Sequence, residues 1–146
     1  MSSGTIRTYR PDPTTVDDQQ TCGRATFHVS RLEPWLLLIT VTGEIDATNG
    51  RALGRFAERH TGTSTQLVLD LGEATFFGSQ GFTALHYLSV SCARSDVDWM
   101  VVAGREARRL LRIVDPDGAL PTVDTVHAAV ELLDRHTRRG AVPWAG

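Results

Sequence analysis

The spacing of apolar and polar positions predicts strands that alternate with helices. A weakly alternating stretch at 25–31 is interrupted by Glu33-Pro34, and a nearly continuous apolar run over 35–43 follows, which is typical of a buried central strand. Two shorter apolar runs, at 67–71 and 98–104, predict further buried strands. A last short run at 120–124 predicts an edge strand.

Helical periodicity occurs between these strands. Asp46 or Thr48 is the predicted N-cap of a first helix that carries an apolar stripe. Residues 73–78 are predicted to turn, and a second helix begins at Ser79. A third helix over 105–114 is stopped by Asp115-Pro116, and a fourth covers 126–136.

The predicted order is β-β-α-β-α-β-α-β-α. Helices between strands imply parallel pairs with right-handed crossovers, while the opening two strands are antiparallel at one side. We therefore expect one α/β domain with a mostly parallel central sheet of about five strands, flanked by about four helices. This domain covers 23–140, after a polar, aperiodic and flexible tail over 1–22 and before a short tail over 141–146.

The composition of the chain excludes several classes of function. The 146 residues are 41% hydrophobic, which is enough for one core. Fifteen basic residues, all of them Arg, and 17 acidic residues leave a net charge of -2, so no basic excess points to nucleic acid or an anionic membrane. Without Lys, neither a Schiff-base enzyme nor a phosphate loop with its essential Lys is possible.

The chain is expected to be cytoplasmic. Its longest apolar run, 35–41, is far shorter than the roughly 20 residues that cross a bilayer, and its first 20 residues show no signal-peptide pattern. Cys22 and Cys92 form no C-x-x-C pair, which suits a reducing compartment. No metal and no cofactor are expected, because neither metal-ligand spacing nor a glycine-rich dinucleotide motif is present.

The most informative segment runs from the strand at 67–71 through two aromatic residues to Ser79 at the start of a helix. Unpaired backbone N–H groups and the helix dipole favour an anion at such a position. One reading is that the Ser79 hydroxyl caps the helix. The others are that it is phosphorylated or acts as a nucleophile.

Hydrolysis fits the residues poorly. A nucleophile elbow has the pattern G-x-S-x-G, and here Phe77 stands where the first Gly is needed. The chain is also short for that fold, and no oxyanion loop is visible. We expect no enzymatic activity.

Two helices carry stripes of arginine at helical spacing. One stripe lies at 51, 55 and 59, and the other lies at 105, 108, 109 and 112. Such stripes are usually solvated faces, and the alternative is contact with an acidic partner or a phosphate.

Two motifs resemble those of the STAS domain of bacterial anti-sigma factor antagonists. The segment Gly43-Glu44-Ile45-Asp46 is similar to the family's G-E-hydrophobic-D segment. The stretch 67–82, LVLDLGEATFFGSQGF, is similar to its D-hydrophobic strand followed by F-x-D-S-S-G. The resemblance covers about 24–138 and includes the order of the elements, so it implies a STAS-like fold.

The resemblance implies a partner-switching protein that regulates sigma-factor-dependent transcription. Its expected partners are an anti-sigma factor with a histidine-kinase-like ATPase domain, which phosphorylates Ser79 and so releases itself, and a PP2C-like phosphatase. Direct contact with nucleic acid or a membrane is not expected. The expected partner-binding residues are Asp46, Phe77, Gly78, Ser79, Gln80 and Gly81.

Two positions depart from the family pattern. Gly78 stands where the family usually has Asp, and Gln80 stands where it has a second Ser. The first change removes a carboxylate beside the target hydroxyl, and the second leaves one hydroxyl in the motif. The alternative function is therefore a STAS scaffold that is not phosphorylated, or a module that binds a small ligand in signalling.

Overall fold

The apolar runs at 36–39, 67–69 and 99–102 lie side by side as strands in the middle of one sheet in the computed structural model, which describes residues 16–140. The elements in chain order are β1 (Val16–Cys22), β2 (Ala25–Glu33), β3 (Leu36–Ile45), α1 (Gly50–His60), β4 (Gln66–Phe77), α2 (Ser79–Ser95), β5 (Asp98–Val102), α3 (Gly104–Val114), β6 (Thr122–Val123) and α4 (Val126–Gly140).

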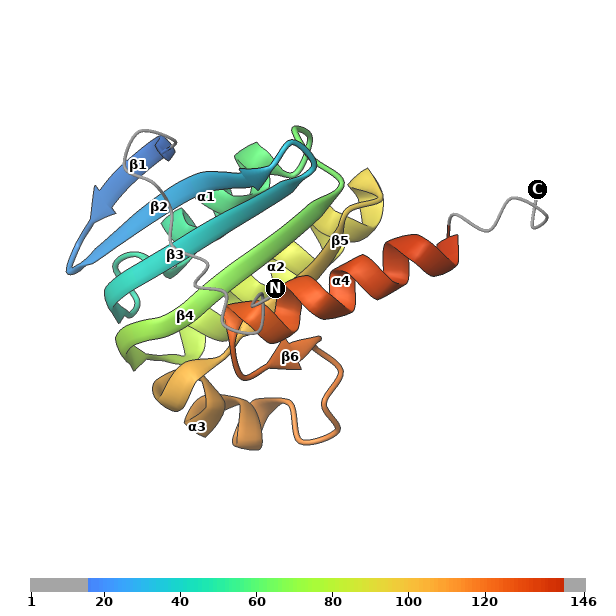
Figure 1. Ribbon diagram of the computed structural model, residues 1–146. Helices are drawn as coiled ribbons and strands as arrows, with labels where there is room; N and C mark the ends of the chain where they lie inside the picture. The colour runs from blue at the N-terminus through green and yellow to red at the C-terminus, as the bar shows by residue number, and fades with distance from the viewer. Residues whose placement is uncertain (1–15, 141–146) are drawn as a thin grey trace.

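The described residues form a six-stranded sheet in the order β1-β2-β3-β4-β5-β6 (Figure 1). β1 pairs with β2 and β2 with β3 in antiparallel fashion, whereas the pairs β3–β4, β4–β5 and β5–β6 are parallel. Helices connect the parallel strands as the crossover rule requires. The predicted α/β class, with a mostly parallel sheet and four helices, is confirmed.

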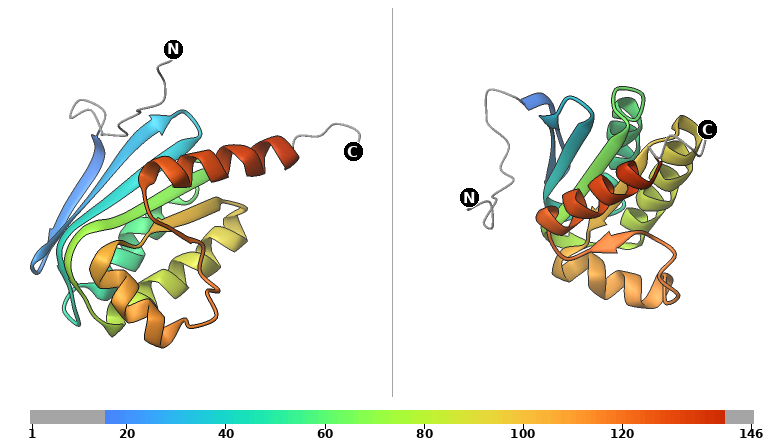
Figure 2. Two further views of the ribbon diagram at one scale, coloured as in Figure 1. Left: turned by 60° about the horizontal axis from the view of Figure 1, so that its bottom comes forward. Right: turned by 45° about the vertical axis from the view of Figure 1, so that its right-hand side comes forward.

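Alternate side chains of the central strands supply two cores. Leu37, Ile39, Leu67 and Leu69 face the core shared with α1, α2 and α3. Their sequence neighbours Leu36, Leu38 and Val68 face the other side, where α4 covers them through Ala129 and Leu133. Figures 1 and 2 show α4 on one face of the sheet, with α1 and α2 on the other. Both faces of the sheet are thus covered, which explains the continuous apolar runs.

The predicted tail is wrong over residues 16–22, which form β1. This strand has no apolar alternation, since its sequence is VDDQQTC. Backbone pairing with β2 holds it, together with an ion pair of 3.0 Å from Arg59 of α1 to Asp18. Residues 1–15 and 141–146 lie outside the described residues, so the remainder of both predicted tails and the domain boundaries stay predictions.

Two local predictions are also wrong. Residues 73–77 do not turn, because the end of β3 offers them backbone partners: Gly43 pairs with Ala74 and Ile45 with Phe77. The first helix begins at Gly50 with Asn49 in the cap position, and no side chain caps it. The Asp46 carboxylate instead accepts hydrogen bonds from the N–H and hydroxyl of Thr48 in the turn before the helix.

Candidate functional site

The ends of β3 and β4 meet at one corner of the sheet and position the start of α2. Because the two strands are parallel, Ile45 lies beside Phe77 at their last paired position. The Gly78 N–H donates to the Ile45 carbonyl at 2.9 Å, and α2 begins at the next residue. This corner brings together the two sequence motifs that are separated by some thirty residues along the chain.

The Ser79 hydroxyl is exposed at this corner and does not cap the helix. Gly78 occupies the cap position, and no side chain there bonds the first turn. The hydroxyl of Ser79 donates to the side-chain Oε1 of Gln80 at 3.2 Å. No acidic residue lies in the first turn of α2, so its N–H groups and dipole face solvent without a negative partner from that turn.

The two predicted contact residues that flank this hydroxyl face inward. Phe77 is 4% exposed, and Gly81 is buried directly against its ring. A Cβ added at Gly81 would lie 2.5 Å from Phe77 Cζ, so only glycine lets α2 sit this close to the end of β4. Phe77 and Gly81 therefore position the corner.

The neighbouring aromatic residue, Phe76, is the one that faces solvent. Its side chain is 47% exposed, and its ring leans over Gly78, where an added Cβ would lie 3.1 Å from Phe76 Cε2. Phe76 is one of the two aromatic residues noted before Ser79, but it is not among the predicted contact residues. The period-2 alternation of a strand could have indicated that only one of two successive aromatic residues is buried.

The turn before α1 is held by side chains that bond to nearby backbone. The carboxylate of Asp46 accepts the Thr48 hydroxyl at 2.5 Å and the Thr48 N–H at 2.8 Å, and these two bonds lower the pKa of Asp46 below its usual value. Asn49 is buried and donates to the Cys22 and Glu44 carbonyls, while its Oδ1 accepts the Asp46 N–H. Asn49 therefore ties the β1–β2 hairpin, the end of β3 and the start of α1 together.

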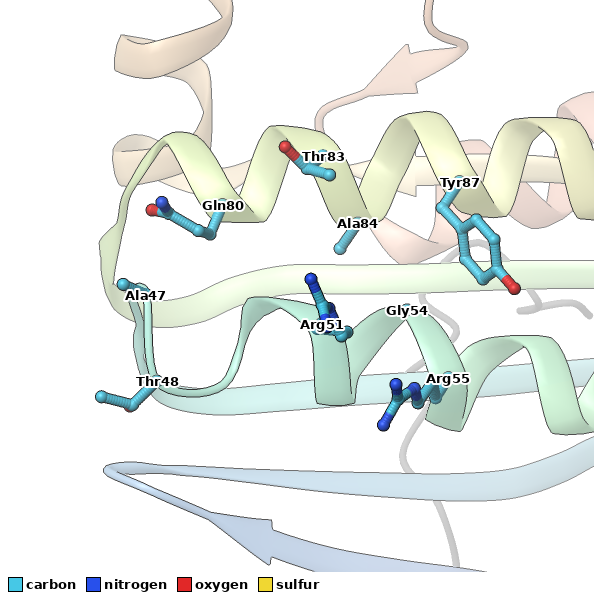
Figure 3. A pocket seen from close by; sticks show the side chains of 9 residues that line it. All are labelled: Ala47, Thr48, Arg51, Gly54, Arg55, Gln80, Thr83, Ala84 and Tyr87. Carbon is cyan, nitrogen blue, oxygen red and sulfur yellow. The ribbon is translucent and has the colours of Figure 1, made fainter.

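A groove of about 700 Å³ lies between α1 and α2 and reaches this corner (Figure 3). Its floor is made of small residues: Gly54 of α1 lies close to Ala84 of α2, since an added Cβ would be 3.7 Å from the Ala84 Cα. At the near end Gly50 packs on Gln80, where an added Cβ would lie 2.6 Å away. The lining side chains are those of Ala47, Thr48, Arg51, Arg55, Gln80, Thr83, Ala84 and Tyr87.

The arginines of the two stripes differ in their ion pairs and ring contacts. On α3, Arg108 pairs with Asp124 at 2.5 Å and Arg109 lies 3.7 Å from Glu106. On α1, Arg59 pairs with Asp18 and stacks on Phe56. Arg51 and Arg55 make no hydrogen bond or ion pair with residues 16–140, and both line the groove; only the Arg51 side chain extends toward α2 in Figure 3.

Cys22 and Cys92 are both free thiols. Cys92 is buried in the core, and burial raises the pKa of its thiol to about 12, which leaves it protonated and unreactive. Across 16–140, no three His, Cys, Asp or Glu side chains gather as a metal site would need. Among the same residues, no helix has the length and apolar character needed to cross a membrane.

Comparison with known proteins identifies the family. The profile of the STAS domain matches residues 29–129. The chain belongs to the STAS-domain family. The family match covers β3, β4 and the Ser79 corner, so the resemblance of the two motifs is confirmed at the level of the family.

This STAS domain also has solved and curated relatives. An anti-sigma factor antagonist from Mycobacterium paratuberculosis superposes with a TM-score of 0.62 at 24% identity, over 74% of this chain and 92% of that one. The anti-sigma factor antagonist SpoIIAA in its unphosphorylated form superposes with a TM-score of 0.61 at 15% identity, over 80% of this chain and 98% of that one. Osmosensory protein A of Mycobacterium tuberculosis is 33% identical over 66 residues, which are 45% of this chain and 42% of that protein. The structural matches establish the shared fold.

Proposed function

We propose that this STAS domain is an anti-sigma factor antagonist in a partner-switching system. The surface around Ser79 binds an anti-sigma factor with a histidine-kinase-like ATPase domain, and that partner phosphorylates Ser79 and dissociates. A PP2C-like phosphatase restores the binding form. The observation that carries the proposal is the exposed Ser79 hydroxyl, which does not cap α2 although it stands at the helix start.

Family and fold support this role. The chain is a STAS domain, and the two solved structures that it superposes on are anti-sigma factor antagonists. One of these two proteins, SpoIIAA, was solved in its unphosphorylated form. For the present chain, the position of Ser79 gives a kinase unobstructed access to the hydroxyl.

The electrostatics of the corner explain how a phosphate acts as a switch. Phosphorylation adds about -1.5 to -2 charges at neutral pH, and the free N–H groups of α2 stabilise them. The partner then meets a highly charged group where it had met a neutral hydroxyl. Contact is expected from Asp46, Gly78, Ser79 and Gln80, with Phe77 and Gly81 supporting them from beneath.

Two features favour the alternative, a STAS scaffold or ligand-binding module that is not phosphorylated. Gly78 places no carboxylate next to Ser79 in the chain, and the Gln80 Oε1 accepts a hydrogen bond from the Ser79 hydroxyl. Both changes alter the surroundings of the group to be phosphorylated. The two functions are separated by the response of partner binding to charge at Ser79.

The test compares affinity capture by four forms of the chain: wild type, Ser79→Ala, Ser79→Glu and Ser95→Glu. Ser95 is exposed at the other end of α2, so its variant adds the same charge to the same helix away from the corner. The proposal expects a histidine-kinase-like ATPase with wild type, Ser79→Ala and Ser95→Glu, and its loss with Ser79→Glu. The captured ATPase with ATP should then add one phosphate to wild type and none to Ser79→Ala.

Two outcomes would contradict the switch. Equal capture by wild type and Ser79→Glu would show that charge at Ser79 does not control binding, and the scaffold function would replace the switch. Capture without transfer of phosphate to Ser79 would leave a constitutive antagonist.

A further inference from the structure

The groove between α1 and α2 carries unneutralised positive charge. Arg51 and Arg55 line it, both are exposed, and neither makes a hydrogen bond or ion pair with the described residues. In Figure 3 the Arg51 side chain extends from α1 toward α2. No Asp or Glu lines the groove, whereas Arg59, Arg108 and Arg109 elsewhere each face an acidic group.

The two ends of the groove differ in charge. At the Gln80 end, the first turns of α1 and α2 lie together without an acidic residue in either, and Arg51 belongs to the first turn of α1. The Asp46 carboxylate lies in the turn before α1, where it is bonded to the hydroxyl and N–H of Thr48. Both helix dipoles and the guanidinium favour an anion at the Gln80 end. At the other end, Tyr87 donates its hydroxyl to both oxygens of Glu58 at 2.9 Å, which raises the pKa of Tyr87 and places a negative charge beyond the groove.

The length of the groove indicates the class of its occupant. From Gln80 to Tyr87, α2 advances by about 10 Å, at roughly 1.5 Å per residue. About three residues of extended chain cover that distance. Arg51 and Arg55 are one helical turn apart, so they match carboxylates on successive same-side residues of such a chain. A volume of about 700 Å³ also exceeds what one compact anion needs.

The geometry points to a docking groove for an acidic, extended segment of a protein partner, held by Arg51 and Arg55 and oriented with its carboxylates toward the start of α2. The Gln80 amide supplies a further donor, and Thr83 and Tyr87 line the groove beside it. Charge complementarity selects this occupant, since a basic segment would meet two arginines and two positive helix ends.

This step rests on the proposed function. The groove explains why phosphorylation of Ser79 weakens partner binding instead of strengthening it. Ser79 is bonded to Gln80, which lines the groove, so a phosphate on Ser79 stands at the same end as Arg51. The phosphate and the partner's carboxylates then compete for the same positive groups, the Arg51 guanidinium and the N–H groups at the start of α2. Phosphorylation thus lowers the affinity for the acidic segment by electrostatic competition.

The test uses a synthetic peptide of alternating Glu and Ser, added to the isotope-labelled chain and followed by amide and Arg Nε–Hε NMR signals. A peptide with Gln in place of Glu is the ligand control, and inorganic phosphate is the small-anion control. The protein variants are Arg51→Gln/Arg55→Gln and, as the matched pair on α3, Arg105→Gln/Arg112→Gln. All four arginines are exposed, and the unliganded spectra verify that each variant is folded.

The inference expects saturable shifts at the groove residues with the Glu peptide, and about tenfold weaker binding in Arg51→Gln/Arg55→Gln because two partly exposed ion pairs are lost. The control variant Arg105→Gln/Arg112→Gln should change the affinity for the Glu peptide less than twofold. Ser79→Glu should weaken peptide binding in the same direction as the groove variant.

Three results would overturn it: shifts spread equally over α1 and α3, an unchanged affinity in Arg51→Gln/Arg55→Gln, or equal effects of phosphate and peptide, which would mean a small-anion site only. The measurement uses the chain alone, so it is independent of whether Ser79 is phosphorylated. If the peptide does not bind the groove, the capture result at Ser79 is unaffected. If the capture experiment fails, the peptide-binding result is equally unaffected.

Discussion

Among individual side chains, Asn49 has the largest predicted structural effect at the corner. It is 1% exposed and bonds to three backbone groups, those of Cys22, Glu44 and Asp46. A buried backbone group that loses its partner costs about 1–3 kcal/mol. The sequence pattern did not indicate this role, because the bond to Cys22 joins residues 27 positions apart and forms only in the folded chain.

We expect Asn49→Ala to lower the free energy of unfolding by about 2–4 kcal/mol, because one substitution removes three hydrogen bonds. Urea denaturation measures the change. Thr48→Ala is the control in the same turn: Thr48 is exposed, and its loss should cost under about 1 kcal/mol. If the two variants are equally stable, Asn49 does not hold the corner together.

Individual helices and strands depend on local contacts that the sequence pattern shows only in part. β1 is attached to α1 through Asp18, which pairs with Arg59 at 3.0 Å and lies 3.4 Å from His60. Desolvation raises the pKa of Asp18, but the hydrogen bonds from Arg59 and the Gln19 N–H, together with the contact to His60, outweigh it, so the pKa lies below the usual value of 3.8. The ionised form therefore stabilises the fold above that pH, and the contribution is lost as pH falls through the lowered pKa.

We accordingly expect Asp18→Asn to be less stable than wild type at pH 7 by under about 1 kcal/mol, since the carboxylate is partly exposed and screened. The difference should shrink to nothing once the pH lies below the lowered pKa. Urea denaturation at a series of pH values measures it, with the exposed Asp117→Asn as control. A difference that persists unchanged in acid would show that the charge of Asp18 is not what attaches β1.

The start of α2 depends on the absence of a side chain at Gly81. An alanine Cβ there would lie 2.5–2.7 Å from three atoms of the Phe77 ring, so the helix start or the ring must move. We expect Gly81→Ala to cost about 1–3 kcal/mol and to shift the amide signals of Ser79 and Gln80. Gly62→Ala, whose added Cβ meets no atom within 4 Å, should stay within about 0.5 kcal/mol of wild type. Unmoved Ser79 signals in Gly81→Ala would contradict this role.

In the domain as a whole, one face of the sheet contributes mainly to stability, and the elements on the other face carry the proposed binding surface. α4 covers one face through Ala129 and Leu133, while the Ser79 corner and the groove belong to the elements on the other face. Gln66 of β4 adds a hydrogen bond of 3.0 Å to the Leu133 carbonyl. Substitutions under α4 should therefore destabilise the domain without changing the surface proposed for the partner.

We expect Leu133→Ala to lower the free energy of unfolding by about 2–5 kcal/mol, because a fully buried leucine leaves a cavity. At a temperature where the variant is folded, partner capture and peptide binding should match wild type. Calorimetry gives the first quantity and the capture assay the second, and the half-buried Leu132→Ala should cost less. Lost binding in folded Leu133→Ala would show that the two faces are coupled.

The sequence by itself determined the central strands, the four helices and the α/β class, because continuous apolar runs and helical stripes are local patterns set by burial. It also determined the family and the position of Ser79 at a helix start. Tertiary structure alone decided that the polar segment 16–22 is a strand, that β4 continues to Phe77, and that Phe77 is buried while Phe76 is exposed. These features depend on backbone partners and packing contacts from distant segments. The groove between α1 and α2 has the same origin, since two helices far apart in the chain must pack before Arg51 and Gln80 can share one surface.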